Sequence, residues 1–431
     1  MQELKRVVTL RDAVMINLGA IIGAGIFVII GLAAYYSGPA LPIAILISGI
    51  IAMFTGLSFS YLTKYSGKEG GVYEYVKDSF NRYAGFIAGI LWVASNLIAI
   101  AAVATSFVTY FYLLFGGHGS ILVSILIILF FALINILGIK SSSLTTTVLV
   151  IINVLTLVVF SISSLFYFNT NNFNNMLNIP INNIIYGAAI IFFAYTGFSR
   201  VTTIGDEVIN PEKTIPLAII ISILISIVIY ASVSIAAIGL ISPKELASSA
   251  APLETAINKI GNPLLSIIIA IGGITATAGV LLTGILGSSR VLYAMGRDNE
   301  LPKWLSYLDR FSTPKNAIAI ATIISLLFLV FVSFNNIVES TNLAILLAYL
   351  LINVSAFYVS IKEKRASYSI NSILGMITII IVISTLNLES FEIVSIILLI
   401  SISYLIIREK LGKKVKEVES HSLVREFKIN K

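Results

Sequence analysis

Residues Gly19–Phe27 read Gly-Ala-Ile-Ile-Gly-Ala-Gly-Ile-Phe, and the rest of the chain is interpreted around them. They lie in the middle of the first long apolar run, 12–35, which is about long enough to cross a bilayer. The small residues at positions 23–25 disfavour a continuous helix. A membrane tolerates unpaired backbone groups only where they are buried in protein or line a polar cavity. This stretch therefore predicts a broken helix beside an internal site.

A second candidate break lies at Phe192–Ser199, which reads Phe-Phe-Ala-Tyr-Thr-Gly-Phe-Ser. Two interrupted spans in corresponding positions of two halves indicate the binding site of a transporter. Each stretch also has a plainer interpretation. Gly19 and Gly23 form a small-xxx-small pair, which is typical of close helix packing in membranes. Aromatic side chains at 192–195 are equally typical of a protein core.

The composition predicts an all-α integral membrane protein and not an enzyme. The chain has 431 residues, of which 58% are hydrophobic and 11% charged, against about 25% charged in ordinary soluble proteins. Near-continuous apolar runs favour helices over barrel strands. There is no cysteine, and the two histidines, His118 and His421, lie outside the predicted spans. We therefore expect no metal site, no catalytic residues and no bound cofactor.

About 12 transmembrane helices are expected, in one domain over residues 1–408 that is followed by a charged, solvated tail at 409–431. The expected spans are 12–35, 40–63, 83–114, 119–139, 145–168, 182–204, 215–241, 263–295, 316–334, 340–361, 370–387 and 391–408. Because their number is even, both termini lie on the same side. Short helices are also expected within 242–262 and around Trp304.

The distribution of basic residues indicates which side is cytoplasmic. If both termini are inside, only Lys244 and Lys259 of the 28 Lys and Arg residues fall in outward loops. Cytoplasmic loops of membrane proteins carry such an excess of positive charge. The asymmetry supports the span count and predicts a multi-pass protein of the cell membrane with cytoplasmic termini. It also accounts for the net charge of +7 without any nucleic acid partner.

Acidic residues are absent from the predicted membrane interior. From the third span to the tenth, every Asp and Glu lies in a loop or at its edge, whereas proton and ion pathways usually contain buried ionisable groups. Recognition is therefore expected to rest on backbone groups, helix ends and hydroxyls, which suit a zwitterion. Arg200, just past the second break, is expected to extend to the cytoplasmic face and not to bind substrate.

Four motifs, in order, resemble those of the amino acid–polyamine–organocation (APC) superfamily of transporters. Gly19–Gly31 is similar to the family's first-helix signature, and Gly70–Tyr75 to its first cytoplasmic loop. Phe192–Pro216 is similar to its sixth helix and the loop after it, and Ser289–Pro302 to the end of its eighth helix. The resemblance covers roughly residues 11–302, and hydropathy alone supports it beyond that point.

The resemblance implies a 5+5 inverted repeat, at about 11–168 and 182–361, with broken first and sixth helices and two extra helices at about 370–408. It implies a secondary active amino acid transporter, or permease, that works by alternating access. Backbone amides at the first break would bind the substrate carboxylate, and carbonyls at the second break its ammonium group. The substrate-binding residues would be Ile22, Gly23, Ala24, Gly25, Ile26, Phe193, Ala194, Tyr195, Thr196 and Ser199.

Two of the implied residues would act as gates. Phe193 would be an aromatic lid, and Glu207 would belong to a cytoplasmic latch that pairs with a basic residue. The loop around Glu207 can also be a plain connector, in which Pro211 and Pro216 stop one helix and start the next. Some relatives that carry cationic substrates have an acidic residue where Ser199 stands, so the resemblance favours a neutral or apolar amino acid.

The sequence leaves a proton and sodium open as coupling ions. Asn153 falls where some proton-coupled relatives have a lysine, and asparagine cannot titrate. Carbonyls near 19–22 and the hydroxyls of Thr275 or Thr277 would offer oxygens to sodium, although lone hydroxyls usually bond to their own helix. The alternatives are an amino acid exchanger, a polyamine or amine carrier, and a non-transporting amino acid sensor on the same fold. The expected partners are the small-molecule substrate and the lipid bilayer.

Overall fold

The computed structural model describes residues 4–117, 119–331 and 334–429, so the prediction about His118 falls outside the described residues. Within these ranges the chain is helical apart from loops and two isolated β-bridges, Val8 with Val208 and Glu69 with Ile204. The all-α prediction is confirmed. Nine apolar helical segments in the same ranges are long enough to cross a membrane, and the first of them contains two predicted spans. Two shorter apolar helices take the places of the fourth and ninth spans.

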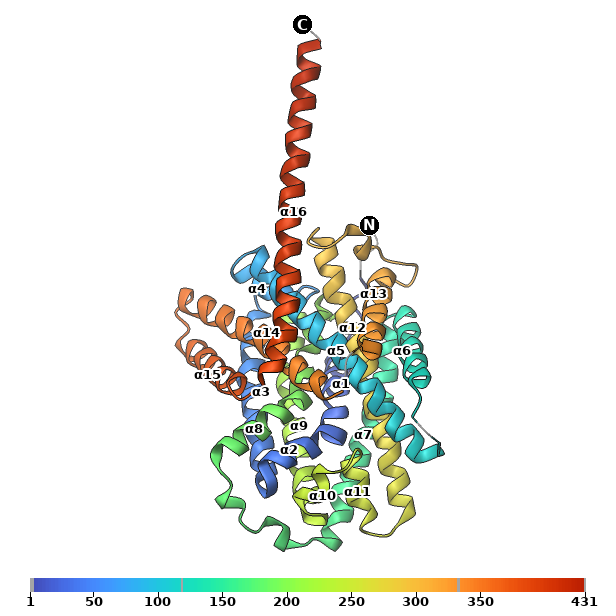
Figure 1. Ribbon diagram of the computed structural model, residues 1–431. Helices are drawn as coiled ribbons and strands as arrows, with labels where there is room; N and C mark the ends of the chain where they lie inside the picture. The colour runs from blue at the N-terminus through green and yellow to red at the C-terminus, as the bar shows by residue number, and fades with distance from the viewer. Residues whose placement is uncertain (1–3, 118, 332–333, 430–431) are drawn as a thin grey trace.

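The helices form one bundle, in which segments far apart in the sequence lie side by side (Figure 1). The helices of the first five spans are α1 (Leu10–Ile21), α2 (Ile30–Ser37), α3 (Leu41–Leu62), α5 (Arg82–Phe115), α6 (Ile121–Ile136) and α7 (Ile139–Ser164). Those of the later spans are α8 (Ile181–Ile191), α9 (Pro211–Leu240), α12 (Pro263–Arg297), α13 (Lys315–Phe331), α14 (Phe334–Lys362), α15 (Ala366–Ile383) and α16 (Leu388–Ile429).

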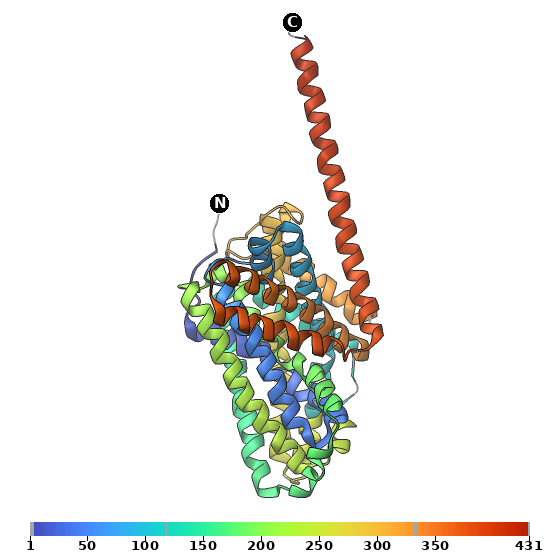
Figure 2. The ribbon, with the colours of Figure 1, turned by 90° about the vertical axis from the view of Figure 1, so that its left-hand side faces the viewer.

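One end of the bundle is rich in charge, and we call it the basic face. It is formed by the α3–α4 loop, α4 (Val72–Ser79), the loop before α9 and the C-terminal end of α12, and it carries Lys77, Arg82, Arg290 and Arg297. The N-terminal segment and the far part of α16 lie at this same end (Figures 1 and 2). The opposite end carries α10 (Pro243–Ala247) and α11 (Pro252–Asn258).

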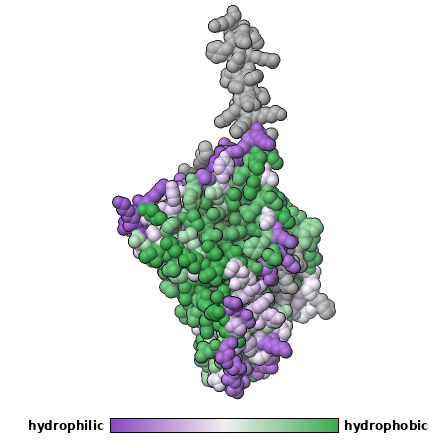
Figure 3. Space-filling model, turned by 60° about the vertical axis from the view of Figure 1, so that its left-hand side comes forward, coloured by the Kyte–Doolittle hydropathy of each residue, from purple (hydrophilic) through white to green (hydrophobic). Residues whose placement is uncertain are grey.

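Apolar side chains cover the surface between the two ends. Figure 3 shows this hydrophobic surface across the middle of the molecule, with polar surface toward the ends. Large side chains such as Phe130, Leu133 and Val228 are more than half exposed there. In water such a surface would be a liability, whereas in a bilayer it faces lipid. The short helices α10, α11 and η8 (Lys303–Ser306) confirm those predicted within 242–262 and around Trp304.

The first span is broken where the sequence predicts it. Thr9 begins α1 with a capping box that it shares with Asp12, and α1 ends at Ile21. Ile22 then has an extended backbone, with φ −77° and ψ 90°. The chain resumes as a five-residue π-helix, η1 (Gly25–Ile29), before α2. Short π-helical segments inside α-helices occur mainly at functional sites.

The second interruption is a change of helix type. At Ile191, α8 ends and the chain continues as a 12-residue 3-10 helix, η6 (Phe192–Thr203). Runs of 3-10 helix longer than three or four residues are uncommon and often mark a hinge. The break predicted at Phe192–Ser199 is therefore confirmed. The structure extends it to Thr203, and the chain stays helical throughout the segment.

The last span is part of a longer helix than the sequence suggests. The predicted span 391–408 lies within α16, whose backbone stays helical through the predicted tail to Ile429. The tail is rich in residues with good helix propensity, such as Lys, Glu and Leu, which accounts for this continuation. The expectation that the tail is solvated concerns side chains beyond residue 410, outside the described part of the structure.

Candidate functional site

The two interrupted helices touch each other. A Cβ atom on Gly25 would lie 2.4 Å from the Cα of Ala194, and one on Gly197 would lie 2.3 Å from the backbone carbonyl carbon of Ala20. Only glycine permits backbones to approach this closely. The structure thus brings together two stretches that are predicted to bind substrate and that lie about 170 residues apart in the sequence. Ile22, Ala24, Ile26 and Ala194 are all buried there.

Tyr230 of α9 joins the two breaks through a single hydroxyl. It donates to the carbonyl oxygen of Ile21 at 2.7 Å and to that of Ala194 at 3.2 Å. Ile21 is the last residue of α1, so its carbonyl needs a partner from outside that helix. Tyr110 of α5 supplies the same kind of bond to the carbonyl of Phe27 in η1, at 2.7 Å. Neither tyrosine was predicted from the sequence. The one feature that could have indicated them is a side chain with a hydroxyl group within an otherwise apolar span.

Asn17 is a further connection that the sequence did not reveal. Its side-chain oxygen accepts a hydrogen bond from the backbone N–H of Val201 at 2.9 Å, and its amide nitrogen donates to the Ser222 hydroxyl at 3.3 Å. Asn17 is completely buried, and buried polar groups are kept only where they are bonded. It therefore fixes α1 to η6 and α9 on the basic-face side of the breaks.

Replacing Tyr230 by phenylalanine is expected to weaken function without unfolding the protein. The change removes one buried hydrogen-bond donor and deprives the carbonyls of Ile21 and Ala194 of their shared partner, at a cost of about 1 kcal/mol, or roughly fivefold in uptake at low substrate concentration. Ser232→Ala on the same helix is the control, because the Ser232 hydroxyl bonds only to its own helix, at Val228. Equal uptake by Tyr230→Phe and Ser232→Ala would show that the bridge is dispensable.

The side chains predicted at the second break point in different directions. Phe193 is buried at 8% exposure, and Thr196 is half-buried, with its hydroxyl donating to the Phe193 carbonyl at 2.9 Å. The Tyr195 hydroxyl reaches α3, where it donates to the carbonyl of Ile45 at 3.3 Å. Tyr195 thus anchors the break to α3, and substrate contacts of Phe193 and Thr196 stay a prediction.

Ser199 belongs to a hydrogen-bonded chain that ends on the second break. The Trp92 indole donates to Ser199 at 3.3 Å, the Ser199 and Tyr349 hydroxyls are 2.8 Å apart, and Tyr349 donates to the Thr196 carbonyl at 2.6 Å. The carbonyls of Ala194 and Thr196 therefore each accept one bond from a tyrosine. Both carbonyls lie within η6, where a 3-10 helix pairs carbonyls with N–H groups three residues further on, so the tyrosine bonds add to those of the helix itself.

The predicted ion-site residues are only partly assembled. Asn153 is buried, and its side-chain oxygen accepts a hydrogen bond from the Thr275 hydroxyl at 2.5 Å. The hydroxyl of Thr277 bonds to its own helix, at the carbonyls of Gly273 and Ile274. The structure thus brings Asn153 and Thr275 together and leaves Thr277 apart from them.

The expectation that Arg200 extends to the cytoplasmic face is wrong. Its side chain is only 4% exposed. It turns toward α5, where it donates to the side-chain oxygen of Asn96 and lies over the ring of Trp92 at 4.9 Å. Snorkelling requires a free path along the helix surface, and the packing of η6 against α1, α3, α9 and α12 removes that path.

A buried ion cluster closes the basic face beneath the breaks. Arg290 of α12 donates to Glu207 through Nε at 2.9 Å, and its Nε lies 3.5 Å from Glu69 of the α3–α4 loop. All three residues are at most 1% exposed. Backbone bonds add to the closure, since the Glu207 carbonyl accepts from the N–H groups of Val7 and Val8, at 2.9 and 3.0 Å. Glu207 is therefore paired with a basic residue, as the latch hypothesis requires.

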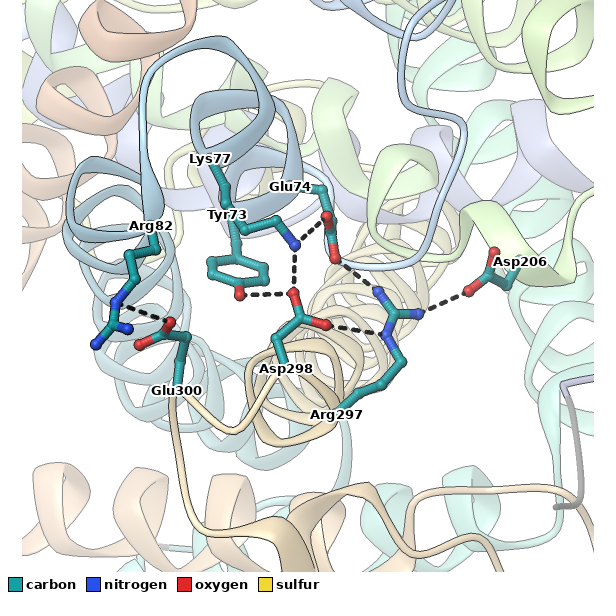
Figure 4. A network of polar contacts seen from close by, with 8 residues as sticks. All are labelled: Tyr73, Glu74, Lys77, Arg82, Asp206, Arg297, Asp298 and Glu300. Atoms are coloured by element: carbon teal, nitrogen blue, oxygen red, sulfur yellow. Dashed lines mark hydrogen bonds and ion pairs between the residues drawn. The ribbon is translucent and has the colours of Figure 1, made fainter. Parts of the chain in front are cut away.

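A second network lies closer to the surface of this face (Figure 4). Arg297 is within 2.6 Å of Glu74 and 3.1 Å of Asp206, and Lys77 is within 2.6 Å of Glu74. Asp298 accepts from Tyr73 at 2.8 Å. These bonds join α4, the loop before α9 and the end of α12, so three separate elements must part for this face to open.

Burial changes the protonation of the buried cluster. Desolvation raises the pKa of Glu69 well above its ordinary value, the nearby Glu207 carboxylate adds to the rise, and Arg290 opposes it. Burial also raises the pKa of Glu207, against the influence of Arg290. Neither oxygen of Glu69 has a hydrogen-bond partner within the described residues. Two carboxylates thus share one guanidinium, and Glu69 is the one that favours its protonated form.

Stability is expected to depend on pH through Glu69. Its folded-state pKa is raised, so the free energy of unfolding falls as pH rises from the unfolded-state pKa of about 4.3 through the folded-state pKa. Glu69→Gln should flatten this fall and raise the melting temperature at neutral pH, because an amide carries no charge. The test is the melting temperature across acidic to neutral pH, with the exposed Glu212→Gln as control. A wild-type slope in Glu69→Gln would contradict the assignment.

A cavity of about 980 Å³ opens on the basic face, outside the buried cluster. Its lining includes Arg6, Asp206, Tyr293, Arg297 and Lys303. None of its lining residues belongs to either helix break, so it is distinct from the candidate substrate site.

Known proteins that are similar to this chain are transporters and permeases. The chain is 29% identical over 421 residues to an uncharacterised transporter of Mycobacterium tuberculosis, with 97% of this chain and 94% of the relative covered. It is 27% identical to two Bacillus subtilis proteins, a branched-chain amino acid permease, covering 84% of this chain and 82% of that one, and a methylthioribose transporter, covering 86% and 85%. The family model for amino acid permeases matches residues 8–409. The chain therefore belongs to the amino acid permease family.

Proposed function

We propose that the protein is a secondary active transporter that moves a neutral or apolar amino acid across the cytoplasmic membrane by alternating access. The contact between the two broken helices carries the proposal, because helix ends bring unpaired N–H and C=O groups to one place. The carboxylate and ammonium group of an amino acid, attached to one carbon, need these two kinds of partner. The name of the B. subtilis branched-chain amino acid permease supports the same class of substrate.

Each part of the substrate has a candidate partner. The backbone N–H groups at Gly23 and Gly25 would bind the carboxylate, and the carbonyls of Ala194 and Thr196 would accept from the ammonium group. Phe193 would cover the substrate as a lid. Ser199, which is neutral and buried, offers no counter-charge to a cationic side chain, which favours amino acids over polyamines.

The basic face would be the cytoplasmic one, since membrane proteins concentrate Lys and Arg on that side. In the arrangement described, the Glu207–Arg290 contact closes this face. Release of substrate to the cytoplasm would require this contact and the Arg297 network to separate. Glu207 would then act as the latch of the inner gate.

The test is uptake of a labelled amino-acid mixture into proteoliposomes that contain the purified full-length protein. Sodium, proton and zero gradients are compared, and single amino acids then compete with the label. Saturable uptake that one gradient accelerates would support secondary active transport and identify the coupling ion. Uptake only into vesicles preloaded with amino acid would instead identify an exchanger. Silence under all conditions, together with binding of an amino acid, would favour the sensor alternative.

A further inference from the structure

Among the described residues, Arg200 is a buried charge without a counter-charge. Six charged side chains are buried in the described part of the chain: Glu69, Glu74, Arg200, Glu207, Arg290 and Glu300. Five of them lie within 4.0 Å of an opposite charge. No described carboxylate lies that close to Arg200. Its Nε and Nη1 atoms also have no hydrogen-bond partner among the described residues.

The surroundings of Arg200 compensate its charge only in part. Nη2 donates to Asn96, and the guanidinium lies 4.9 Å from the ring centroid of Trp92. On the other side it packs against α12, where a Cβ on Gly287 would lie 2.5 Å from Nη1. An amide oxygen and an aromatic face attract a cation, but neither carries a negative charge. The Nε–H and Nη1–H groups are left without an acceptor among the described residues.

Arg200 lies deep in the bundle. Trp92 follows Arg82 by ten residues along α5, and Gly287 precedes Arg297 by ten residues along α12, so each helix places Arg200 about 15 Å inward from the basic face. That is about half the thickness of the hydrocarbon core. A guanidinium stays protonated at any physiological pH. An ionised group at this depth is costly unless it has a partner, and such groups mark substrate or ion pathways.

We propose that Arg200 forms an anion-binding site beside the second helix break and that its ligand is a small monovalent anion. Arg200 follows Thr196 by four residues in η6, a rise of about 8 Å, so the site lies between the breaks and the basic face. Ser199, next to it, is bonded to the same Trp92. Arg290, one turn beyond Gly287 on α12, already has Glu207 and Glu69 as partners, whereas Arg200 requires a ligand from outside.

Two sources can supply this anion. It is either the side-chain carboxylate of an acidic amino acid or a free halide, such as chloride, that binds together with a neutral substrate. The halide agrees with the neutral or apolar substrate proposed above, whereas an acidic amino acid would replace that substrate class and keep the transport function. Both would make charge-assisted hydrogen bonds with the guanidinium. Cationic side chains are excluded at this position because they would meet a buried like charge. The inference deepens the proposed transport function and rests on it for the role of the anion, but anion binding can be measured without transport.

Trp92 is a built-in reporter for this site. The chain has two tryptophans, so Trp304→Phe leaves Trp92 as the single emitter. The purified protein is titrated at constant ionic strength with chloride in exchange for the bulky anion gluconate, and then with glutamate or leucine in gluconate. We expect a saturable change in Trp92 emission with chloride, or with glutamate but not with leucine. Chloride identifies a free anion as the source, and glutamate alone identifies the substrate side chain.

Arg200→Gln in the same background should abolish the response, and Arg200→Lys should retain a weaker one, since lysine keeps the charge but loses the planar fork. The matched control is Trp92→Phe, in which Trp304 at the basic face should not respond. A Trp92 response that persists in Arg200→Gln, or no response of the wild-type site to any of these anions, would overturn the proposal. If Arg200→Gln does not fold, the proposal is tested by the titration of the intact site and by the weaker response expected of Arg200→Lys. Absence of uptake with the emission response intact would reject transport and leave the anion site standing.

Discussion

Arg290→Met is expected to lower the stability of the protein by about 3–5 kcal/mol, the usual cost of removing one partner from a buried ion pair. Arg290 contacts both Glu207 and Glu69, and all three residues are at most 1% exposed. Without the guanidinium, the Glu207 carboxylate would be left beside the carboxyl group of Glu69 with no counter-charge, in a site that water does not reach. The measurement is the melting temperature of the purified protein in detergent, together with its elution as a single species.

Compensating substitutions test whether charge is the cause. Arg290→Met combined with Glu69→Gln and Glu207→Gln should recover most of the lost stability, because well-packed neutral replacements of a buried ion cluster are often neutral or stabilising. Lys259→Met is the control, since its pair with Glu245 is exposed on both sides, at 54% and 39%, and exposed pairs contribute little. If Arg290→Met and Lys259→Met melt alike, the buried cluster does not contribute to the stability of the closed face.

Gly25→Ala is expected to reduce transport by more than tenfold, through the smallest possible change in side chain. The new Cβ would lie 2.4 Å from the Cα and the Cβ of Ala194 and 3.1 Å from its backbone nitrogen. Those neighbours are backbone or attached directly to it, so the two breaks must move apart. Overpacking of this kind typically costs about 1–3 kcal/mol. It would also separate the N–H and C=O groups that are proposed to bind one substrate.

The control for Gly25→Ala is Gly119→Ala, where a new Cβ would meet its nearest neighbour at an ordinary 3.8 Å. Initial uptake rates in proteoliposomes are compared after normalising for the amount of folded protein. Transport by Gly25→Ala at the rate of Gly119→Ala would mean that the close approach of the breaks is not needed in any step of the cycle.

Much of the architecture could be predicted because membrane helices have few alternatives. Backbone groups in a bilayer must be paired within a helix or within the protein. The apolar runs therefore predict the spans, and Gly23 and Gly25 predict the first break. The second break was predicted from its small and aromatic residues, but the 3-10 geometry up to Thr203 was not. Helix type depends on neighbouring elements, which no local pattern records.

The contacts that organise the site could not be predicted from local sequence. Tyr230 meets two carbonyls that lie 209 and 36 residues away in the chain, and nothing in its own span shows where its hydroxyl points. Arg200 was expected to reach the surface because the packing of α5 and α12 around it is a property of the folded bundle. Glu69 lies in what the sequence shows as a glycine-rich turn, and its burial arises only when Arg290 and Glu207 come together.

The 3-10 geometry of η6 has a mechanical consequence. A 3-10 helix rises about 2.0 Å and turns 120° per residue, against 1.5 Å and 100° for an α-helix. Rewinding the 12 residues of Phe192–Thr203 into α-helix would shorten the segment by about 6 Å and rotate its far end by about two thirds of a turn. A single change of helix type in this segment would thus combine a translation along the helix axis with a rotation about it. With Ala194 held by Tyr230, the residues beyond it in η6 would contribute about 4.5 Å of this shortening, and that displacement would reach Glu207, where the basic face is closed.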